Sequence, residues 1–528
     1  MSKPFYITTA IDYVNGQPHL GHAYEKIVTD VIARARRSLG ETAFFLTGLD
    51  EHGQKVQQAA LKEGRTPQAY CDALAADWRS LAGTLELTND DFIRTTDGRH
   101  KQTVQAILAK LHAAGHFYQA EYRGFYSAKE ETFLTEKDRL PDGTFDSSYG
   151  EVVELVEHNY YFKLKDQQQW LIDYIEANPS FIQPDYRRNE VLGFLKNNTL
   201  EDLCITRPAA RLNWGIPLPF DPAYVTYVWF DALVNYVSVP ASLGDPTVCA
   251  ALGISTSPLS PPTSPLNLWP ADAHVIGKDI LKFHAVYWPI MLKAMGLALP
   301  KQIIAHGWWQ KNGEKMSKTT GNVVDPVAVI GEWGVDAFRY YVVRELDLGP
   351  DGNWTDAGFI ARYDSELANG LGNLLNRSLS MLKKYRNGIV PQGSPAGGDN
   401  AGLIGPNDVP AIEADLRAAH LQGALVKIWE IVTRANQYIQ RTEPFRMAKV
   451  PEKAGELDVV LYNLVETCRV LAVLLWPFIP GTSEKIYAQL GLKDSPAKFS
   501  EAAWGKLAAG HAIGEPAALF PRKDLAAK

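Results

Sequence analysis

Residues 5–24 constrain the fold of this chain more than any other stretch, because they read as a strand, a tight turn and a helix in succession (FYITTAIDYVNGQPHLGHAY). The run Phe5–Thr9 is apolar and β-prone, whereas an Asn-Gly pair and Pro18 supply turn geometry. A helical pattern follows over residues 20–39. This succession predicts the opening of a nucleotide-binding α/β unit with a parallel sheet.

The first turn of that helix carries two histidines, His19 and His22, which lie three residues apart and therefore on one face. A helix N-terminus attracts anions through its N–H groups and its dipole, so the two imidazoles are candidates for stabilising charge on a phosphate oxygen. Gly21 lies between them and lets a flat ligand such as a purine approach the backbone. Taken alone, such a pair is more often two solvated histidines in a polar turn.

A second stretch, far along the chain, favours the functional interpretation. Residues 303–322 read IIAHGWWQKNGEKMSKTTGN, and Lys315 and Lys318 flank Met-Ser in a Gly-rich loop. HLGH followed by KMSKT, each after an apolar strand-like run, resembles the signature pair of the class I aminoacyl-tRNA synthetases.

Length, net charge and cysteine content limit the number of domains, the way nucleic acid can bind and the kinds of cysteine site that the chain can form. A chain of 528 residues is too long for one core and predicts three or four domains. With a net charge of −7, any nucleic acid must be bound by local basic patches. The cysteines are far apart and form no CxxC, which argues against disulfides and a thiolate zinc site and fits a reducing compartment; they are Cys71, Cys204, Cys249 and Cys468.

No signal peptide is evident, and the longest apolar run, residues 470–479, is too short to span a bilayer. We therefore expect a cytoplasmic protein that does not enter a membrane. A Ser/Pro-rich stretch at 253–271 predicts a surface loop, to which we assign no role.

The expected architecture is an α/β fold: a Rossmann-type parallel sheet split by a mixed α/β insertion and followed by a C-terminal α-helical bundle. Further strands are expected at 42–48, 224–229, 273–277 and 303–306, and two long helical segments at 412–442 and 452–476. The expected domains are 1–115 with 225–325 (Rossmann catalytic), 116–224 (connective insertion), 326–372 (stem contact) and 373–528 (helical anticodon-binding domain and tail).

Several longer blocks resemble the methionyl-tRNA synthetase family within class I, and they occur in that family's order. They are TTAIDYVNGQPHLGHAY, FLTGLDEHGQKV, YVWFDALVNYVS, HVIGKDILKFHAVYWP and HGWWQKNGEKMSKTTGNVVDP. The resemblance implies that the chain activates L-methionine with ATP and Mg²⁺, forming methionyl-adenylate and pyrophosphate. The resemblance further implies that the chain transfers methionine to the 3′ end of tRNA(Met) and reads the CAU anticodon of that tRNA.

The resemblance also implies roles for individual residues. The catalytic groups, which also bind ATP, are His19, His22, Lys315 and Lys318. Gly21, Gly277 and Asp279 complete the ATP site. Asp50 is the expected anchor for the methionine ammonium, and the rest of the methionine pocket is Ile11, Tyr13, Trp229, Leu233, Tyr236 and His284. The anticodon residues are Asn373, Arg377, Pro444 and Phe445. Leu233 and Phe445 depart from the family's usual proline and tryptophan.

The insertion shows the clearest departure from the family, many of whose members carry CxxC zinc knuckles there. The corresponding stretch is GFYSAKEETFL, with Ser127 and Glu130 near the expected cysteine positions and His158 as the only nearby histidine. No tetrahedral Cys/His set can be assembled, so we expect no structural zinc and no other metal site. The dimerisation domain of some relatives is not expected after Phe520, so a monomer is predicted.

Three alternatives remain open at this point. Leucine, isoleucine and valine synthetases carry a large editing domain, for which the insertion is too short, and a cysteine synthetase would need a thiolate-rich zinc site. A synthetase-derived RNA-binding protein would not need both histidines and both lysines. An unrelated nucleotidyltransferase shares HxGH but is usually shorter and lacks the helical bundle.

Overall fold

The computed structural model describes residues 3–14, 17–127, 129, 132–134, 136–254, 266–316, 321–393 and 402–523. Two compact units make up the chain, which passes between them several times. The first, here called the sheet unit, comprises residues 1–18, 44–83 and 89–306. The second, called the helical unit, comprises 19–43, 84–88 and 307–528.

The sheet unit is built on a parallel sheet. Seven strands of the described residues form it in the order β2-β3-β1-β12-β13-β8, with β4 also paired to β3. The pairings β1–β12, β12–β13, β13–β8, β2–β3 and β3–β4 are all parallel. The strands are β1 (Phe5–Thr9), β2 (Asp12–Tyr13), β3 (Ala43–Asp50), β4 (Asp91–Arg94), β8 (Ile182–Gln183), β12 (Ala273–Gly277) and β13 (Ile303–His306). The strands expected at 5–9, 42–48, 273–277 and 303–306 are thereby confirmed.

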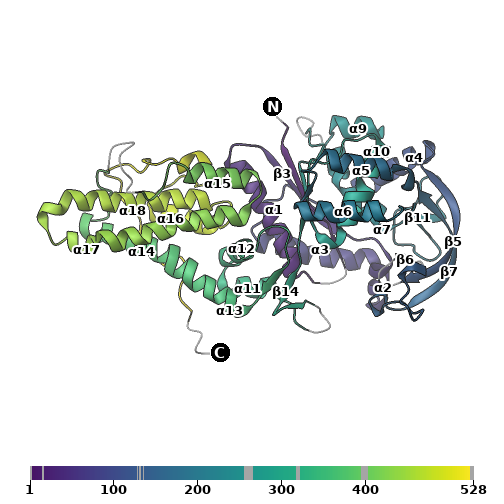
Figure 1. Ribbon diagram of the computed structural model, residues 1–528, viewed down its shortest axis with the longest axis horizontal. Helices are drawn as coiled ribbons and strands as arrows, with labels where there is room; N and C mark the ends of the chain where they lie inside the picture. The colour runs from purple at the N-terminus through teal and green to yellow at the C-terminus, as the bar shows by residue number, and fades with distance from the viewer. Residues whose placement is uncertain are drawn as a thin grey trace. The chain divides into compact units, whose positions relative to one another are not determined.

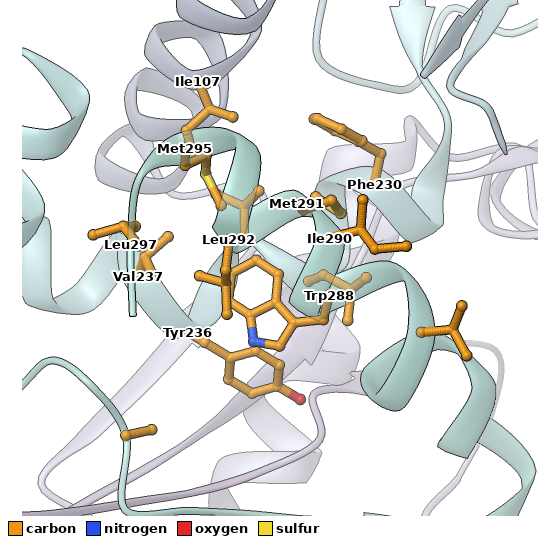
Figure 2. Close-up of a cluster of buried hydrophobic side chains, with 14 of the residues drawn as sticks. Ile107, Phe230, Tyr236, Val237, Trp288, Ile290, Met291, Leu292, Met295 and Leu297 are labelled. Atoms are coloured by element: carbon orange, nitrogen blue, oxygen red, sulfur yellow. The ribbon is translucent and has the colours of Figure 1, made fainter. Parts of the chain in front are cut away.

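Helices pack against this sheet because its strands are apolar on both faces, as β12 shows by being buried at every residue. The helices are α2 (Gln54–Lys62), α3 (Pro67–Thr84), α4 (Gly98–Ala113), α7 (Val228–Leu233), α8 (Asn235–Ser242), α9 (Pro246–Leu252) and α10 (Trp288–Met295), preceded by a π-helical turn at Phe283–Tyr287. Figure 2 shows part of the core that they enclose, where Trp288 of α10 lies beside Tyr236 of α8.

The insertion forms a second sheet, in which β5 (Phe117–Ser127) and β7 (Val152–Phe162) pair antiparallel over their full length (Figure 1). Short strands β6 (Thr132–Leu134) and β9 (Leu203–Cys204) extend it on either side. Helices α5 (Gln168–Ala177) and α6 (Asp185–Asn197) follow β7. The mixed α/β insertion expected from the sequence is therefore present.

The expected parallel strand at 224–229 is wrong. Residues Tyr224–Thr226 form β11, which pairs antiparallel with β10 (Thr206–Pro208), and the chain then enters α7. The run YVTYVWF is apolar throughout, and such a run does not distinguish a strand from a short buried helix.

The helical unit begins with α1 (Leu20–Ser38) and includes a small sheet of β15 (Glu314–Lys315), β14 (Trp309–Lys311) and β16 (Gly352–Trp354). Its other helices are α11 (Pro326–Trp333), α12 (Val335–Arg344), α13 (Asp356–Arg362), a π-helix at Tyr363–Gly372, α14 (Asn373–Arg386), α15 (Asp408–Arg417), α16 (Leu421–Thr442), α17 (Pro444–Met447), α18 (Ala454–Leu475) and α19 (Pro480–Gln489). In Figure 1, α14, α16 and α18 run alongside one another.

One of the two long helices expected in this unit is interrupted. Residues 412–442 contain the second half of α15 and all of α16, and between these helices Ala419 has a φ of 59°. A positive φ at alanine is strained, and nothing in the local sequence predicts it. Every helix in the described part of the chain is too short or too polar to cross a lipid bilayer.

A buried carboxylate attaches the segment after α19 to α18. Glu466 is fully buried and accepts hydrogen bonds from the backbone N–H groups of Gly505, Lys506 and Leu507, at 2.7, 3.0 and 3.2 Å. Arg469, one turn further along α18, pairs with this carboxylate at 2.6 Å and donates to the carbonyl oxygens of Glu501 and Ala503.

The Glu466→Ala variant should unfold at a clearly lower urea concentration, with a loss of about 3–5 kcal/mol, because it leaves the buried Arg469 guanidinium without a counter-charge and three backbone N–H groups without an acceptor. Urea unfolding followed by circular dichroism measures this. Glu456→Ala, an exposed position of the same helix, is the matched control and should cost less than about 1 kcal/mol. Equal losses in the two variants would contradict the anchoring role of Glu466.

Candidate functional site

The two histidines of the HLGH motif cap helix α1 reciprocally. His19 is the N-cap residue, and its Nδ1 accepts from the Gly21 N–H at 3.1 Å. The Nδ1 of His22 accepts from the His19 N–H at 3.2 Å. The rings stack with centroids 3.8 Å apart. Because each Nδ1 accepts a hydrogen bond, each neutral ring carries its proton on Nε2, where it can serve as a donor to an anion.

Gly21 is favoured in this arrangement because its Cα lies close to the His19 ring. A Cβ atom at Gly21 would lie 3.0 Å from His19 Cε1 and 3.2 Å from its Nδ1. A larger residue would therefore press against the imidazole that caps the helix. Glycine at position 21 therefore avoids a clash with the His19 ring, in addition to leaving room for a ligand.

The first lysine of the KMSKT motif lies in a β-hairpin of the helical unit. Lys315 is exposed in β15, and its Nζ lies 4.8 Å from the ring centroid of Trp308, which is 39% exposed. The Asn322 side chain donates to the Lys315 carbonyl at 3.2 Å. Lys318 lies outside the described residues.

Gly277 and Asp279 lie together at the carboxyl end of β12, in the sheet unit. A Cβ atom at Gly277 would come within 2.5 Å of the Asp279 Oδ1, so a larger residue would displace the carboxylate from its present position. Asp279 itself is exposed, in a 3₁₀ turn. A carboxylate that projects beyond a strand end is suited to accept hydrogen bonds from hydroxyl groups, such as those of a ribose.

The residues expected to bind methionine also belong to the sheet unit. Asp50 ends β3 and is 5% exposed, and its register partner in the neighbouring strand β2 is Tyr13. These expected pocket residues differ in burial. The buried ones are Asp50, Leu233, Tyr236 and His284, and the partly exposed ones are Ile11, Tyr13 and Trp229. Leu233 and Tyr236 also belong to the main core cluster, against which Ile11 packs.

Tyr236 and His284 are joined by a hydrogen bond whose direction can be assigned. His284 Nδ1 lies 2.9 Å from the carbonyl oxygen of Ile280, which can only accept, so Nδ1 carries a proton. Burial lowers the pKa of His284 to about 4, so the ring is neutral at pH 7. Its Nε2 therefore accepts from the Tyr236 hydroxyl at 2.7 Å.

Behind Tyr236 lies a second buried histidine that sequence reasoning did not single out. The ring of His274, in β12, stacks on that of Tyr236 with centroids 4.1 Å apart. Its Nε2 accepts from the indole N–H of Trp288 at 3.3 Å, and its Nδ1 lies 2.8 Å from the Thr8 hydroxyl. The His274 ring therefore supports one face of the Tyr236 ring, while His284 binds the Tyr236 hydroxyl.

Phe283 was also missed. Its ring stacks on Trp229 with centroids 3.7 Å apart and planes at 12°. Phe283 directly precedes His284 in the π-helical turn, so one turn contacts two aromatic residues of the expected pocket, Trp229 and Tyr236. The block HVIGKDILKFHAVYWP contains Phe283, but nothing in its spacing pairs it with Trp229.

The helical unit contains a groove of about 700 Å³ between the π-helix and α14 on one side and α16 on the other. Asn373 and Arg377 of α14 both line it. They face α16, whose contribution includes Trp429, Gln437 and Gln440. Carboxamide and guanidinium groups around a groove can form hydrogen bonds with the edges of nucleic-acid bases.

Pro444 and Phe445 do not line this groove. Pro444 is buried at the start of α17, whereas the Phe445 ring is 43% exposed. The four expected anticodon residues are therefore in one unit, but only two of them share a cavity.

The insertion does not fit the zinc knuckle of many relatives. Ser127 is buried and donates its hydroxyl to the Tyr149 carbonyl at 2.6 Å, and the exposed His158 lies 3.6 Å from Glu121. Cys204 contacts the guanidinium of Arg207 rather than another thiol. Across the described ranges, no three His, Cys, Asp or Glu side chains gather to hold a metal ion. Glu130 lies outside those ranges.

Comparison with known proteins gives the family. The family model described as tRNA synthetases class I (M) matches residues 5–155 and 147–379. A second model, the anticodon binding domain of methionyl tRNA ligase, matches residues 390–524.

Individual relatives agree over nearly the whole chain. The methionine–tRNA ligase of Bacillus subtilis is 42% identical over 546 residues, covering 99% of this chain and 78% of the relative. That of Rhizobium meliloti is 41% identical over 527 residues, covering 99% and 98%. The structure of Mycobacterium tuberculosis methionyl-tRNA synthetase in complex with methionyl-adenylate superposes with a TM-score of 0.90 at 38% identity, covering 99% of this chain and 100% of that one. The chain therefore belongs to the methionine–tRNA ligases of the class I tRNA synthetases.

Proposed function

We propose that this chain joins the carboxylate of L-methionine to the α-phosphate of ATP, releases pyrophosphate, and transfers methionine from the adenylate to the 3′ end of tRNA(Met). The observation that carries the proposal is the reciprocal capping of His19 and His22 in a chain that matches the methionine family along its length. The direct test is methionine-dependent ATP–pyrophosphate exchange, run against a panel of amino acids. Exchange with leucine or cysteine but not methionine would overturn it.

The phosphate chemistry falls to residues of the helical unit. Adenylate formation needs stabilisation of charge on the phosphates more than covalent help from the protein. The Nε2–H groups of His19 and His22 donate to phosphate oxygens near the positive end of the α1 dipole. Lys315 and Lys318 neutralise the departing pyrophosphate. Mg²⁺ enters with ATP and neutralises phosphate oxygens, and we assign no protein ligand to it.

The amino acid is recognised by residues of the sheet unit. The buried carboxylate of Asp50 pairs with the methionine ammonium, and Gly277 and Asp279 bind the ribose of ATP. The thioether meets aromatic surface from Tyr13, Trp229 and Tyr236, with Ile11 and Leu233 as apolar wall. The neutral His284 holds the Tyr236 hydroxyl in one orientation, so its oxygen presents a fixed polar contact to the sulfur.

The groove between α14 and α16 binds the CAU anticodon of tRNA(Met). Single-stranded bases are recognised by stacking and by hydrogen bonds to their edges, and Asn373 and Arg377 supply the second kind. Phe445, exposed at α17 outside the groove, supplies a stacking surface. It lacks the indole donor of the family's usual tryptophan.

We further propose that the chain acts as a cytoplasmic monomer, and that its domains have the boundaries expected from the sequence: 1–115 with 225–325, 116–224, 326–372 and 373–528.

Lys318→Ala should slow pyrophosphate exchange about a hundred-fold while methionine binding is nearly unchanged, because the lysine contact forms mainly in the transition state. Steady-state exchange together with equilibrium methionine binding measures this. Lys311→Ala, in the same hairpin but outside the motif, is the control. An unchanged rate with a raised methionine KM would refute the assignment.

Phe445→Ala and Arg377→Ala should each weaken aminoacylation of tRNA(Met) about ten-fold or more, since base stacking on Phe445 contributes about 1–3 kcal/mol and a hydrogen bond from the Arg377 guanidinium about 1.5–3 kcal/mol. Pyrophosphate exchange should stay the same, because it does not involve tRNA. Both reactions are measured on one preparation, with Val450→Ala as the exposed control beyond α17. A parallel fall of both reactions in Phe445→Ala would show that the ring is structural.

Purified protein should contain far less than one zinc per chain and should be fully active without added zinc, because the insertion offers no thiolate set. Metal analysis by mass spectrometry and activity after chelation measure this. One equivalent of zinc, with activity lost on its removal, would show that ligands exist which we have not identified.

A further inference from the structure

The only carboxylate of helix α7 lies at the centre of a buried polar network in the sheet unit. The side chain of Asp231 is fully buried. Its Oδ2 is 2.6 Å from His52 Nδ1, and its Oδ1 is 2.6 Å from His100 Nε2. Both imidazoles are buried as well, so each oxygen of the carboxylate accepts one imidazole N–H away from water.

The network connects the elements that carry the proposed methionine pocket. His52 follows Asp50 by two residues at the end of β3, and His100 lies on α4. The other ring nitrogen of His100, Nδ1, is 2.9 Å from the hydroxyl of Ser238 on α8, the helix that carries Tyr236. One carboxylate is thus bonded, directly or through one imidazole, to the elements that hold Asp50 and Tyr236.

The geometry of α7 places Asp231 opposite the pocket residues of the same helix. Successive α-helical residues are about 100° apart, so Trp229 and Leu233 share one face and Asp231 lies on the other. A six-residue helix has too few internal hydrogen bonds to be stable alone. Its orientation therefore depends on outside contacts, which include its junction with α8 through Val234 and the two hydrogen bonds of the Asp231 carboxylate.

The Asp231 carboxylate is ionised, which strengthens its hydrogen bonds to the two imidazoles. Burial alone would raise the pKa of Asp231, but the imidazoles of His52 and His100 outweigh burial and lower the pKa to about 2. The carboxylate is therefore ionised at neutral pH and accepts from both rings at once. Hydrogen bonds to an ionised acceptor are shorter and stronger than those between neutral groups.

We propose that Asp231 is a positioning residue for methionine recognition, which holds α7 so that Trp229 and Leu233 face the amino-acid side chain. The proposal rests on the assignment of the methionine pocket under the proposed function. Asp231 does not itself contact methionine. The end of β3 has a separate anchor, because the buried Glu51 pairs with Arg94 at 2.6 Å. Loss of the Asp231 carboxylate should therefore disturb the side-chain wall of the pocket more than the ammonium site.

The test is Asp231→Asn in the full-length enzyme, assayed by pyrophosphate exchange. The amide keeps the size of the side chain but can accept from only one imidazole. The KM for methionine should rise about ten-fold or more, with the KM for ATP changed less than about two-fold. The preference for methionine over norleucine should fall. A methionine KM within about two-fold of the wild type, or an equal rise in both KM values, would overturn the proposal.

Asp245→Asn is the matched control. Asp245 is also a fully buried carboxylate of the sheet unit, and it accepts from the backbone N–H groups of Thr247, Val248, Leu268 and Trp269. It should lower the melting temperature while the methionine KM stays within about two-fold. If it raised the methionine KM as much as Asp231→Asn does, the effect would be general destabilisation and the proposal would fail.

Two further variants complete the test. Trp229→Ala distinguishes failure of the pocket assignment from failure of the positioning role. If Trp229→Ala leaves the methionine KM unchanged, the pocket assignment fails. If the methionine KM rises in Trp229→Ala but not in Asp231→Asn, only the positioning role is refuted. Should Asp231→Asn not fold, Ser238→Ala removes the contact with His100, together with a hydrogen bond from the hydroxyl to the Val234 carbonyl, and should raise the methionine KM by about two- to five-fold. An unchanged KM in Ser238→Ala would then refute the network.

Discussion

The buried ion pair between Asp30 and Arg339 is the contact on which the helical unit depends. Both side chains are fully buried, and the Arg339 guanidinium, 2.7 Å from the carboxylate, also donates to the carbonyl oxygens of Leu85 and Phe478. Burial would raise the pKa of Asp30, but Arg339 and Arg34 outweigh it and lower the pKa, so the carboxylate stays ionised. Asp30 belongs to helix α1 and is 309 residues from Arg339 in sequence, so this pair orients α1 within the helical unit. The capped histidines at its first turn can be placed only if the whole helix is fixed.

The same device recurs at two other positions. Glu466 attaches the segment after α19 to α18, and Asp231 joins α7 to β3 and α4. Apolar burial supplies most of the stability of such a fold, but it is not directional and tolerates sliding of one element on another. A buried carboxylate with several donors has one good geometry, and an arrangement that leaves any donor unpaired is strongly disfavoured. We infer that these carboxylates set the relative positions of elements that the hydrophobic core alone would leave loose.

The sequence was informative about the fold wherever one physical signal dominated. Continuous apolar runs predicted β1, β3, β12 and β13, because strands covered on both faces of a parallel sheet admit no polar alternation. The same signal gave a wrong prediction at residues 224–229, where an equally apolar run is partly an antiparallel strand and partly α7. The sequence also failed at Ala419, whose positive φ ends one helix before α16 begins. Alanine favours helix, so that break is decided by tertiary packing and not by local preference.

Some residues of the candidate site are close together in sequence and could be predicted, whereas others are far apart in sequence and could not. His19, Gly21 and His22 lie within four consecutive residues because one helix turn must present them together, so the motif can be recognised from the sequence. His52 and His100 are 179 and 131 residues from Asp231, and no spacing rule joins them. Groups that touch a ligand can be recognised by their chemistry, whereas groups that hold them need only be close in space. On our proposal, part of the affinity for methionine belongs to buried residues that never contact it, and substitutions confined to the motifs would assign that part to the wrong side chains.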